Sequence, residues 1–358
     1  MKITILGAGL MGRLLACELV KQGHTLDLFD AGGPQAEQSA ARAAAAMLAP
    51  LAESAVTEPN VVQMGLYGLR RWPELIAQLT QPVNFQQDGT LVLWHHQDSP
   101  DAERFKRQMA ATQARIPELP RLEMLDAKGI SLLEPSLEGR FNEAVYLPGE
   151  GQLDNHQLLA STLDQLERRN VSLHWHSPRS LEEFNPGQPG QPDWVLDCRG
   201  LGAHPQWAGL RGVRGEIVTL EAKEVQLTRP TRLIHPRYPI YIAPKGSNLF
   251  LVGATEIESN DASPMTVRSA LELLSAAYSV DPRFGEARIL ELVSQCRPTL
   301  PDNLPAIRRN GKRVLQINGL YRHGYLIAPA VLDAVMELIQ DGTSPLAERL
   351  SLAIQTTI

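Results

Sequence analysis

The stretch that decides the fold is Lys2–Gly12, KITILGAGLMG, at the N-terminus. Its first five residues, Lys2–Leu6, are mostly apolar and β-branched, which is typical of a short buried strand. A glycine-rich turn follows at once, and residues 10–22 have the apolar spacing of a helix closed by Gly23. Strand, glycine turn and helix in this order predict the first unit of a dinucleotide-binding fold.

The glycines of this turn have separate tasks in such a unit. Gly7 makes the tight turn, Gly9 lets backbone approach a pyrophosphate, and Gly12 allows the helix to pack closely on the strand. A second predicted strand, residues 25–29, leads into Asp30, whose carboxylate suits the hydroxyl groups of a ribose. The predicted cofactor-binding residues of this region are Gly7, Ala8, Gly9, Leu10, Met11, Gly12 and Asp30.

The fingerprint alone fits NAD as well as FAD, whereas an acid at residue 30 disfavours NADP. The next segment, Gln38–Pro50, favours FAD because its small side chains let backbone approach a large flat ring. An NAD dehydrogenase would usually continue with further strand–helix units at this point. The alternative for this segment is an alanine-rich helix that reflects helix propensity alone.

Composition and charge narrow the class of protein. The 358 residues are enough for about two domains. Hydrophobic residues make up 43% and charged residues 21%, which indicates a folded globular protein, and a net charge of −6 without a basic block disfavours nucleic acid as a partner. The three cysteines are far apart and form no CxxC pair, so we expect neither a disulfide framework nor a metal site, and we expect a cytoplasmic location.

The N-terminus has a second interpretation, an export signal with a lipoprotein-like cleavage site at Leu14–Cys17. Arg13 lies in the part of such a signal that must be apolar, and a signal does not require glycines at this spacing. No other stretch approaches 18 uncharged apolar residues, so no membrane span is expected.

The rest of the chain mixes helical and β patterns. Helices are predicted over residues 61–79, 101–115, from a capping box at Asp154, over 266–278, and over 331–340 after a start at Pro329. The apolar stripe of the helix over 266–278 is Val267, Ala270, Leu271 and Leu274. Strands are predicted over residues 90–94, 171–175, 194–198, 212–220, 238–244, 249–253, 288–295 and 313–318, with a surface loop over 185–192.

Motifs along essentially the whole chain resemble the D-amino-acid-oxidase-like FAD flavoproteins, and among them the glycine oxidases of thiamine biosynthesis. They are the opening GxGxxG, Ala46–Pro50, Gly212–Glu216, Tyr241–Pro244, Leu251–Thr255, Arg297-Pro298 and Tyr321–Pro329. The resemblance implies an α/β plus α+β fold. In it, a Rossmann-type FAD-binding domain of residues 1–80, 142–205 and 310–358 is interleaved with a mainly antiparallel substrate-binding domain of residues 81–141 and 206–309.

The resemblance also implies the residues of the active site. Arg297 matches the arginine that binds the substrate carboxylate, Tyr241 matches its hydroxyl partner, and Arg322 matches a position beside flavin and substrate. The further cofactor-binding residues that it implies are Ala46, Met47, Gly200, His323, Gly324, Tyr325, Leu326 and Ile327.

Elementary chemistry supports these roles. A guanidinium group matches a carboxylate with two parallel hydrogen bonds, which a lysine cannot do. Arg297 follows the predicted strand over 288–295 and so can project from a sheet rim into a cleft, and Tyr241 faces away from the isoleucines on either side of it. The alternatives are a surface ion pair for Arg297, a core or rim position for Tyr241 and a solvated loop position for Arg322.

Three residues depart from the glycine oxidase pattern. Ala46 stands where a glycine is expected, His323 where an asparagine is expected, and Pro239 where a polar residue can lie near the substrate. The methyl group of Ala46 can change how backbone meets the flavin, and His323 can add a titrating group near the active site. These departures bear on the substrate more than on the fold.

The resemblance implies oxidative deamination of glycine or sarcosine, with hydride transfer to FAD and reoxidation by oxygen to give hydrogen peroxide. A desolvated apolar pocket would favour the neutral amine without a protein base, and the helix start at Pro329, with the amides of residues 324–327 ahead of it, would stabilise negative charge on the flavin. A homo-oligomer is also implied. The alternatives are an amino acid or N-methyl amine dehydrogenase with a quinone or carrier acceptor, a flavoprotein with a macromolecular client, and an FAD-binding protein with little turnover.

Overall fold

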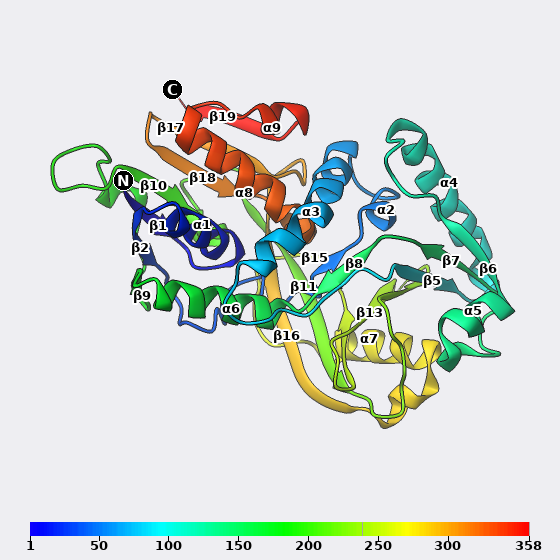
Figure 1. Ribbon diagram of the computed structural model, residues 1–358. Helices are drawn as coiled ribbons and strands as arrows, with labels where there is room; N and C mark the ends of the chain where they lie inside the picture. The colour runs from blue at the N-terminus through cyan, green and yellow to red at the C-terminus, as the bar shows by residue number, and fades with distance from the viewer. Residues whose placement is uncertain (238, 358) are drawn as a thin grey trace.

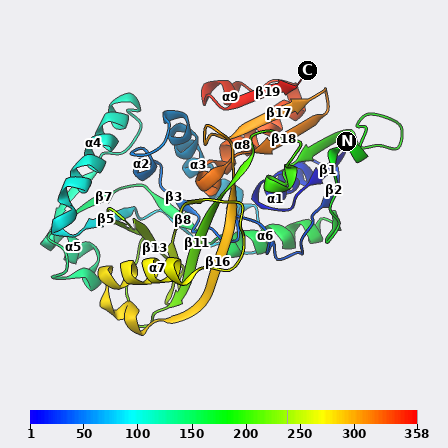
Figure 2. The same cartoon turned by 180° about the vertical axis from the view of Figure 1, so that it is seen from behind.

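The computed structural model describes residues 1–237 and 239–357, and within them two large β-sheets form two lobes. One lobe carries both ends of the chain (Figure 1). Figure 2 shows from behind that the long strands β11 (Arg211–Glu221) and β16 (Arg288–Thr299) extend from the middle of the molecule to the far end of the other lobe. Tyr238, the first residue of the predicted strand over 238–244, lies outside the described residues.

The first sheet has the strand order β19-β17-β18-β10-β1-β2-β9, and only its β17–β18 pair is antiparallel. Ile5 lies opposite Leu196, which in turn lies opposite Leu315, so three distant segments build the centre of the sheet. Its strands are β1 (Lys2–Leu6), β2 (Thr25–Phe29), β9 (Ser172–His174), β10 (Trp194–Asp197), β17 (Ala306–Asn310), β18 (Val314–Asn318) and β19 (Ala353–Thr357).

Four helices cover this sheet and pack against one another (Figure 1). They are α1 (Leu10–Lys21), α3 (Pro59–Ala77), α6 (Asn155–Arg168) and α8 (Gly324–Asp341), and the short α9 (Pro345–Arg349) lies on α8. The predicted cap of α6 is confirmed, because Asp154 Oδ1 accepts a hydrogen bond of 2.9 Å from the backbone N–H of Gln157. The large apolar cluster between these helices and the sheet holds the turn after β1 in place.

The second sheet is mainly antiparallel, with the order β15-β11-β14-β13-β12-β5-β7-β6 and with β16 paired to β11. Only its β12–β5 pair is parallel. Besides β11 and β16, its strands are β5 (Thr90–Trp94), β6 (Glu123–Asp126), β7 (Glu143–Leu147), β12 (Thr231–Ile234), β13 (Ile240–Pro244), β14 (Leu249–Gly253) and β15 (Ile257–Glu258). The predicted mixture of a parallel, dinucleotide-type sheet and an antiparallel sheet is confirmed.

A small third sheet and four further helices complete the fold. The strands are β3 (Met47–Leu48), β4 (Phe85–Gln86) and β8 (Gly151–Leu153), and the helices are α2 (Pro50–Glu53), α4 (Ser99–Arg115), α5 (Ala127–Leu133) and α7 (Val267–Val280). Residues 38–46 form turns and irregular backbone that lead into β3, so the alternative of an alanine-rich helix is wrong.

The predicted domain boundaries stay a prediction, and two strands lie across them. β7 is part of the second sheet, although residues 142–205 are predicted to belong to the FAD-binding domain. β17 joins the first sheet, although the predicted boundary at residue 310 assigns most of it to the other domain.

Helix α7 buries a different face from the one that its sequence predicts. Two residues of the predicted stripe, Val267 and Leu271, are 78% and 60% exposed, whereas the buried residues include Leu273, Ala276 and Val280. The helix is apolar on more than one side, and periodicity alone cannot say which side meets the sheet. Packing against the second sheet decides the face.

The last long helix begins at Gly324 and not at Pro329 as predicted, so the proline lies inside α8. A proline there leaves the carbonyl four residues earlier without its helical donor. That carbonyl belongs to Tyr325, and the indole Nε1–H of the fully buried Trp72 donates a 2.8 Å hydrogen bond to it. The side chain of α3 therefore replaces the missing backbone donor of α8.

This replacement predicts the effect of Trp72→Phe, which removes the donor and leaves a buried carbonyl without a partner. We expect the free energy of unfolding to fall by about 1–3 kcal/mol, measured by urea unfolding. Adding Pro329→Ala restores the N–H group and should recover part of the loss. If Pro329→Ala has the same effect with and without Trp72, the hydrogen bond does not compensate for the proline.

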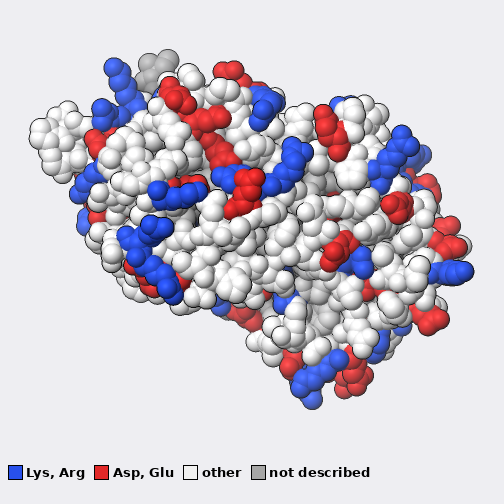
Figure 3. All heavy atoms as spheres, in the orientation of Figure 1, with Lys and Arg blue, Asp and Glu red and all other residues white. Residues whose placement is uncertain are grey.

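The surface charges and the helices concern two further expectations, that nucleic acid is not a partner and that the chain has no membrane span. Figure 3 shows positive and negative side chains interspersed over one face of the molecule, without a broad area of a single sign. Among residues 1–237 and 239–357, none of the helices combines the length and the apolar character that crossing a membrane requires.

Candidate active site

A continuous cavity of about 1160 Å³ is lined by residues of both large sheets. It exceeds the roughly 300–1,000 Å³ of ordinary small-ligand pockets, so it has room for a dinucleotide and a small substrate together. The predicted site residues on its walls are Gly7, Ala8, Gly9, Leu10, Met11, Asp30, Ala46, Met47, Gly200, Tyr241, Arg297, Arg322, His323, Gly324, Tyr325 and Leu326. Two predicted residues do not line the cavity: Gly12 packs below the turn, and Ile327 is fully buried.

The glycine turn has the geometry that its sequence predicts. Gly7 has a φ of +93°, and a Cβ atom on Gly12 would lie 1.8 Å from the carbonyl oxygen of Gly7. No side chain caps the start of α1, where Gly9 is the N-cap residue, and the first turn contains no acid. The first N–H groups of this helix can therefore bind an anionic group such as a pyrophosphate.

Asp30 supports the glycine turn as well as facing the cavity. Its Oδ2 accepts a hydrogen bond of 2.5 Å from the N–H of Ala8, and its Oδ1 accepts one of 2.7 Å from Gly32. Each carboxylate oxygen has a second lone pair, so Asp30 can still accept from a ribose hydroxyl. That contact stays a prediction.

Arg13 is a buried support of the same turn. It is 1% exposed, and its guanidinium donates to the carbonyl oxygens of Ala8, Leu159 and Pro34 at 2.7, 2.6 and 2.6 Å. Burial lowers its pKa. The sequence signal for this supporting role was the position of Arg13 within an otherwise apolar helix pattern.

Lys245 holds the loop that carries Ala46. Ala46 has a φ of +50°, a conformation that favours glycine, which explains why the resemblance predicts a glycine there. The ammonium of Lys245 donates to the carbonyl oxygens of Ala45 at 2.6 Å and Leu153 at 2.8 Å, and the N–H of Leu153 donates to Ala46. Burial lowers the pKa of Lys245 to about 8.

Lys245→Met would leave two of these carbonyl groups without their donor. We expect a loss of about 1–3 kcal/mol in the free energy of unfolding and an FAD dissociation rate raised about tenfold, because the loop loses its anchor. Urea unfolding and flavin fluorescence after dilution measure the two effects. Lys223→Met is the matched control, since that side chain is 75% exposed. Equal flavin retention in both variants would contradict the anchoring role.

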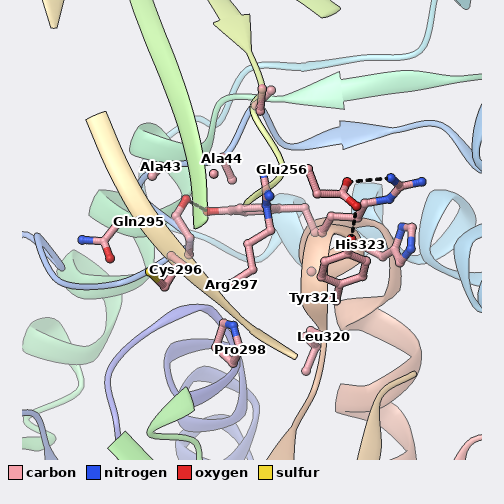
Figure 4. A pocket seen from close by; sticks show the side chains of 18 of the residues that line it. Ala43, Ala44, Glu256, Gln295, Cys296, Arg297, Pro298, Leu320, Tyr321 and His323 are labelled. Carbon is pink, nitrogen blue, oxygen red and sulfur yellow. Dashed lines mark hydrogen bonds and ion pairs between the residues drawn. The ribbon is translucent and has the colours of Figure 1, made fainter. Parts of the chain in front are cut away.

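Arg297 lies within β16, opposite Val213, because the strand continues to Thr299 instead of ending at residue 295 as predicted. Its guanidinium crosses over Gly215, where a Cβ atom would lie 2.2 Å from Nη2, and faces the cavity (Figure 4). Both terminal nitrogens donate 3.2 Å hydrogen bonds to the carbonyl oxygen of Thr255. Within the described part of the chain no carboxylate lies within 4.0 Å of it, so the surface ion pair considered as its alternative is not formed.

Tyr241 lies near this guanidinium. It pairs with Gly253 across the sheet, and a Cβ atom on that glycine would lie 2.6 Å from the tyrosine Oη, so the glycine makes room for the hydroxyl group. Burial raises the pKa of Tyr241 even though Arg297 acts in the opposite direction. The phenol therefore stays protonated near neutral pH and can donate a hydrogen bond.

Arg322 lies between two carboxylates and is not the solvated loop cation of its alternative interpretation. Its Nη2 is 3.0 Å from Glu53 Oε2 and its Nη1 is 3.1 Å from Glu256 Oε2. Glu53 also binds Arg232 at 2.7 Å. Burial acts to raise the pKa of Glu53, but the charges of Arg232 and Arg322 hold it well below its usual range.

His323 is not the titrating group that the sequence allowed. It is 4% exposed, with Nδ1 3.5 Å from Glu53 and Nε2 3.4 Å from the hydroxyl group of Thr57. Burial lowers the pKa of His323 to about 4, and the nearby Glu53 does not compensate. The imidazole is therefore neutral at physiological pH.

The start of α8 also meets the cavity. Because the helix begins at Gly324, the amides of residues 324–327 are its first turn, and this turn contains no acidic residue. Gly324, Tyr325 and Leu326 line the cavity. The positive end of the helix dipole is therefore directed at the cavity from residue 324, not from Pro329.

Sequence reasoning missed five charged or polar residues of the site. Glu53, Glu256, Arg232, Tyr321 and Lys245 all line the cavity or contact its walls. The available sequence signals were Glu53, at the end of the short helix α2, and Glu256, directly after Thr255. Neither signal shows its partners, which come from distant parts of the chain.

Comparison with known proteins shows the family of this chain. The model of the family DAO, FAD dependent oxidoreductase, matches residues 2–338. The chain belongs to this family. It is 39% identical over 337 residues to the "Putative thiamine biosynthesis oxidoreductase ThiO" of Rhizobium etli, covering 94% of this chain and 95% of the relative. It is 24% identical over 365 residues to the glycine oxidase of Geobacillus kaustophilus, covering 94% and 92%.

Solved structures share the fold of this family member. The crystal structure of the Geobacillus kaustophilus glycine oxidase superposes with a TM-score of 0.79 at 23% identity, covering 94% of each chain. That of an iminodiacetate oxidase from a Chelativorans species superposes with a TM-score of 0.80 at 22% identity, covering 99% of this chain and 100% of that one. The protein is thus an FAD-dependent oxidoreductase of the glycine oxidase and ThiO type.

The residues present fit FAD. Two helix starts without a side-chain cap, at α1 and α8, point positive dipole ends at the cavity, and Gly7, Ala8 and Gly9 of the turn between β1 and α1 line it. Ala43, Ala44, Ala45 and Ala46 supply a wall of small side chains. We assign the pyrophosphate to the turn after β1 and the flavin to the region of Ala46 and α8 as predictions.

Proposed function

We propose that this protein oxidatively deaminates a small amino acid, glycine or sarcosine, to glyoxylate. When the substrate is glycine, the reaction consumes one water and one oxygen molecule and releases ammonia and hydrogen peroxide. When bound, FAD would supply the hydride acceptor and the route for the electrons to oxygen. The observation that supports the proposal is Arg297, a cation that faces the cavity with no carboxylate partner in the described part of the chain.

Arg297 and Tyr241 would bind the substrate carboxylate together. A guanidinium group donates two parallel hydrogen bonds to a carboxylate, and the protonated Tyr241 adds a third. Two hydrogen bonds to the Thr255 carbonyl hold Arg297 in one orientation before substrate arrives. A carboxylate fixed in this way places the α-carbon at one position relative to the cofactor.

The start of α8 would stabilise negative charge in the cofactor region. The amides of its first turn, which no side chain caps, and the positive end of its dipole would act together at Gly324–Ile327. The cavity that Arg297 lines also carries the polar side chains of Glu256, Tyr321 and Arg322, so the apolar character expected of the pocket is not uniform. Desolvation alone therefore does not control the protonation state of the substrate amine.

Anaerobic mixing of the yellow holoprotein with glycine, sarcosine, D-alanine and D-proline tests the proposal. We expect glycine or sarcosine to bleach the flavin absorbance band and, in air, to consume oxygen and form hydrogen peroxide. Bleaching without oxygen consumption, together with rapid dye reduction, would favour the dehydrogenase alternative. No bleaching by any of the four would favour a macromolecular client or a protein with little turnover. The name of the Rhizobium etli relative supports a role in thiamine biosynthesis. That the protein forms a homo-oligomer stays a prediction.

A further inference from the structure

Glu256 lies beside the predicted carboxylate anchor but does not pair with it. The residue before it, Thr255, is the one whose carbonyl oxygen holds Arg297. The charge of Arg297 acts on Glu256, yet the two side chains form no ion pair within 4.0 Å among the described residues. An anion and a cation therefore lie next to each other on the cavity wall (Figure 4).

Neighbouring side chains hold the Glu256 carboxylate in place and in its ionised form. Its Oε1 accepts a 2.7 Å hydrogen bond from the hydroxyl group of Tyr321, and its Oε2 accepts one of 3.1 Å from Arg322 Nη1. Burial acts to raise the pKa of Glu256, but the hydrogen bond from Tyr321 and the charge of Arg322 outweigh it and lower the pKa. The side chain remains 51% exposed, so its other lone pairs are accessible from the cavity.

This arrangement complements an amino acid zwitterion, whose ammonium and carboxylate groups are attached to the same α-carbon. A carboxylate on Arg297 places the ammonium within the same part of the cavity that Glu256 faces. Arg322 offers little to a second carboxylate, because it already pairs with Glu53 at 3.0 Å and Glu256 at 3.1 Å. A dicarboxylic substrate would meet two anions there.

We propose that Glu256 binds the protonated amino group of the substrate and, by occupying Arg322, excludes amino acids with a second carboxylate. Glu256 is then a specificity-determining residue of this chain. The inference rests on the proposed function and names the substrate class more narrowly: amino acids with one carboxylate and a cationic amine.

Glu256→Gln tests this inference, because it removes the charge and keeps the shape. We expect the apparent Kd for sarcosine to rise at least about tenfold, since a charge-assisted hydrogen bond is lost. The Kd of methoxyacetate, which has an ether oxygen in place of the amine, should change less than about twofold because it has no cation to lose. Flavin absorbance measures both Kd values in the holoprotein, anaerobically for sarcosine.

A second readout uses the pair D-aspartate and D-alanine. Loss of the Glu256 charge removes one anion from the cavity wall and releases Arg322 Nη1, while Nη2 stays paired with Glu53, so the ratio of flavin reduction by D-aspartate to that by D-alanine should rise about fivefold or more. Glu256→Asp should restore part of the preference for the cationic ligand. Glu258→Gln is the matched control, because this glutamate is 70% exposed and pairs with Arg211 on the surface; it should leave every value unchanged.

Equal weakening of sarcosine and methoxyacetate, with an unchanged D-aspartate ratio, would overturn the inference and assign Glu256 a structural role. No effect of Glu256→Gln on either ligand would overturn it too. These outcomes differ from a failure of the proposed function, in which no amino acid reduces the flavin of the unaltered protein. If Arg297→Ala abolishes reduction and Glu256→Gln does not alter it, the proposed function stands and the inference fails.

Discussion

Arg297→Ala is expected to raise the KM for glycine or sarcosine by about two to three orders of magnitude, because it removes a bidentate, charge-assisted contact from a buried site. FAD should remain bound, since the hydrogen bonds that this side chain forms among the described residues are both to the carbonyl oxygen of Thr255, which is not one of the predicted cofactor-binding residues. Anaerobic flavin reduction at increasing substrate concentration measures the effect. The rate at saturation should fall less than the rate at low substrate.

Two variants control this result. Arg297→Lys keeps the charge but loses the planar fork, so it should recover only part of the affinity. Arg211→Ala removes an arginine from the neighbouring strand β11 that pairs with the exposed Glu258, and it should leave flavin reduction unchanged. An Arg297→Ala protein that is reduced as readily as its parent at low substrate would disprove the carboxylate assignment.

Gly12→Val is expected to lower the FAD content of the purified protein by about tenfold or more. Its first side-chain carbon would lie 1.8 Å from the carbonyl oxygen of Gly7, and backbone cannot yield to such a contact without distorting the turn. The flavin-to-protein absorbance ratio, together with circular dichroism to show that the chain is folded, measures the loss.

The control for Gly12→Val lies at the other end of the same helix. Gly23 has a φ of +83° and no atom within 4 Å of an added Cβ, and asparagine tolerates this conformation. Gly23→Asn should therefore keep its FAD. If both variants retain full flavin, close packing at Gly12 is not needed for the cofactor site.

The parts of the site that the sequence predicts are those that a local pattern determines. The turn from Gly7 to Gly12 needs only a strand, a helix and glycines between them, and the alternation along residues 240–244 is enough to turn Tyr241 away from the core. Arg297 and Arg322 came from a resemblance to a family, since one arginine in a sequence does not show what it faces.

The parts that the sequence does not predict depend on contacts between distant segments. Glu53 meets Arg232, 179 residues away, and Arg322, 269 residues away, and no pattern around Glu53 indicates either partner. The buried face of α7 is decided by the sheet, because the helix is apolar on several sides. From the sequence, Pro329 is predicted to start a helix. It can lie inside α8 because Trp72, from a distant segment, donates to the carbonyl group of Tyr325 that the proline leaves without a helical donor.

The order of strands in the first sheet constrains how this protein is made. On the ribosome, β1 is synthesised first, but its neighbour β10 ends at Asp197 and the next strand outward, β18, ends at Asn318. The nascent N-terminal unit therefore waits for most of the polypeptide before its sheet is complete, and it exposes apolar edges during that time. Yield in cells should consequently depend on chaperones and on translation speed more than that of proteins whose neighbouring strands emerge in succession.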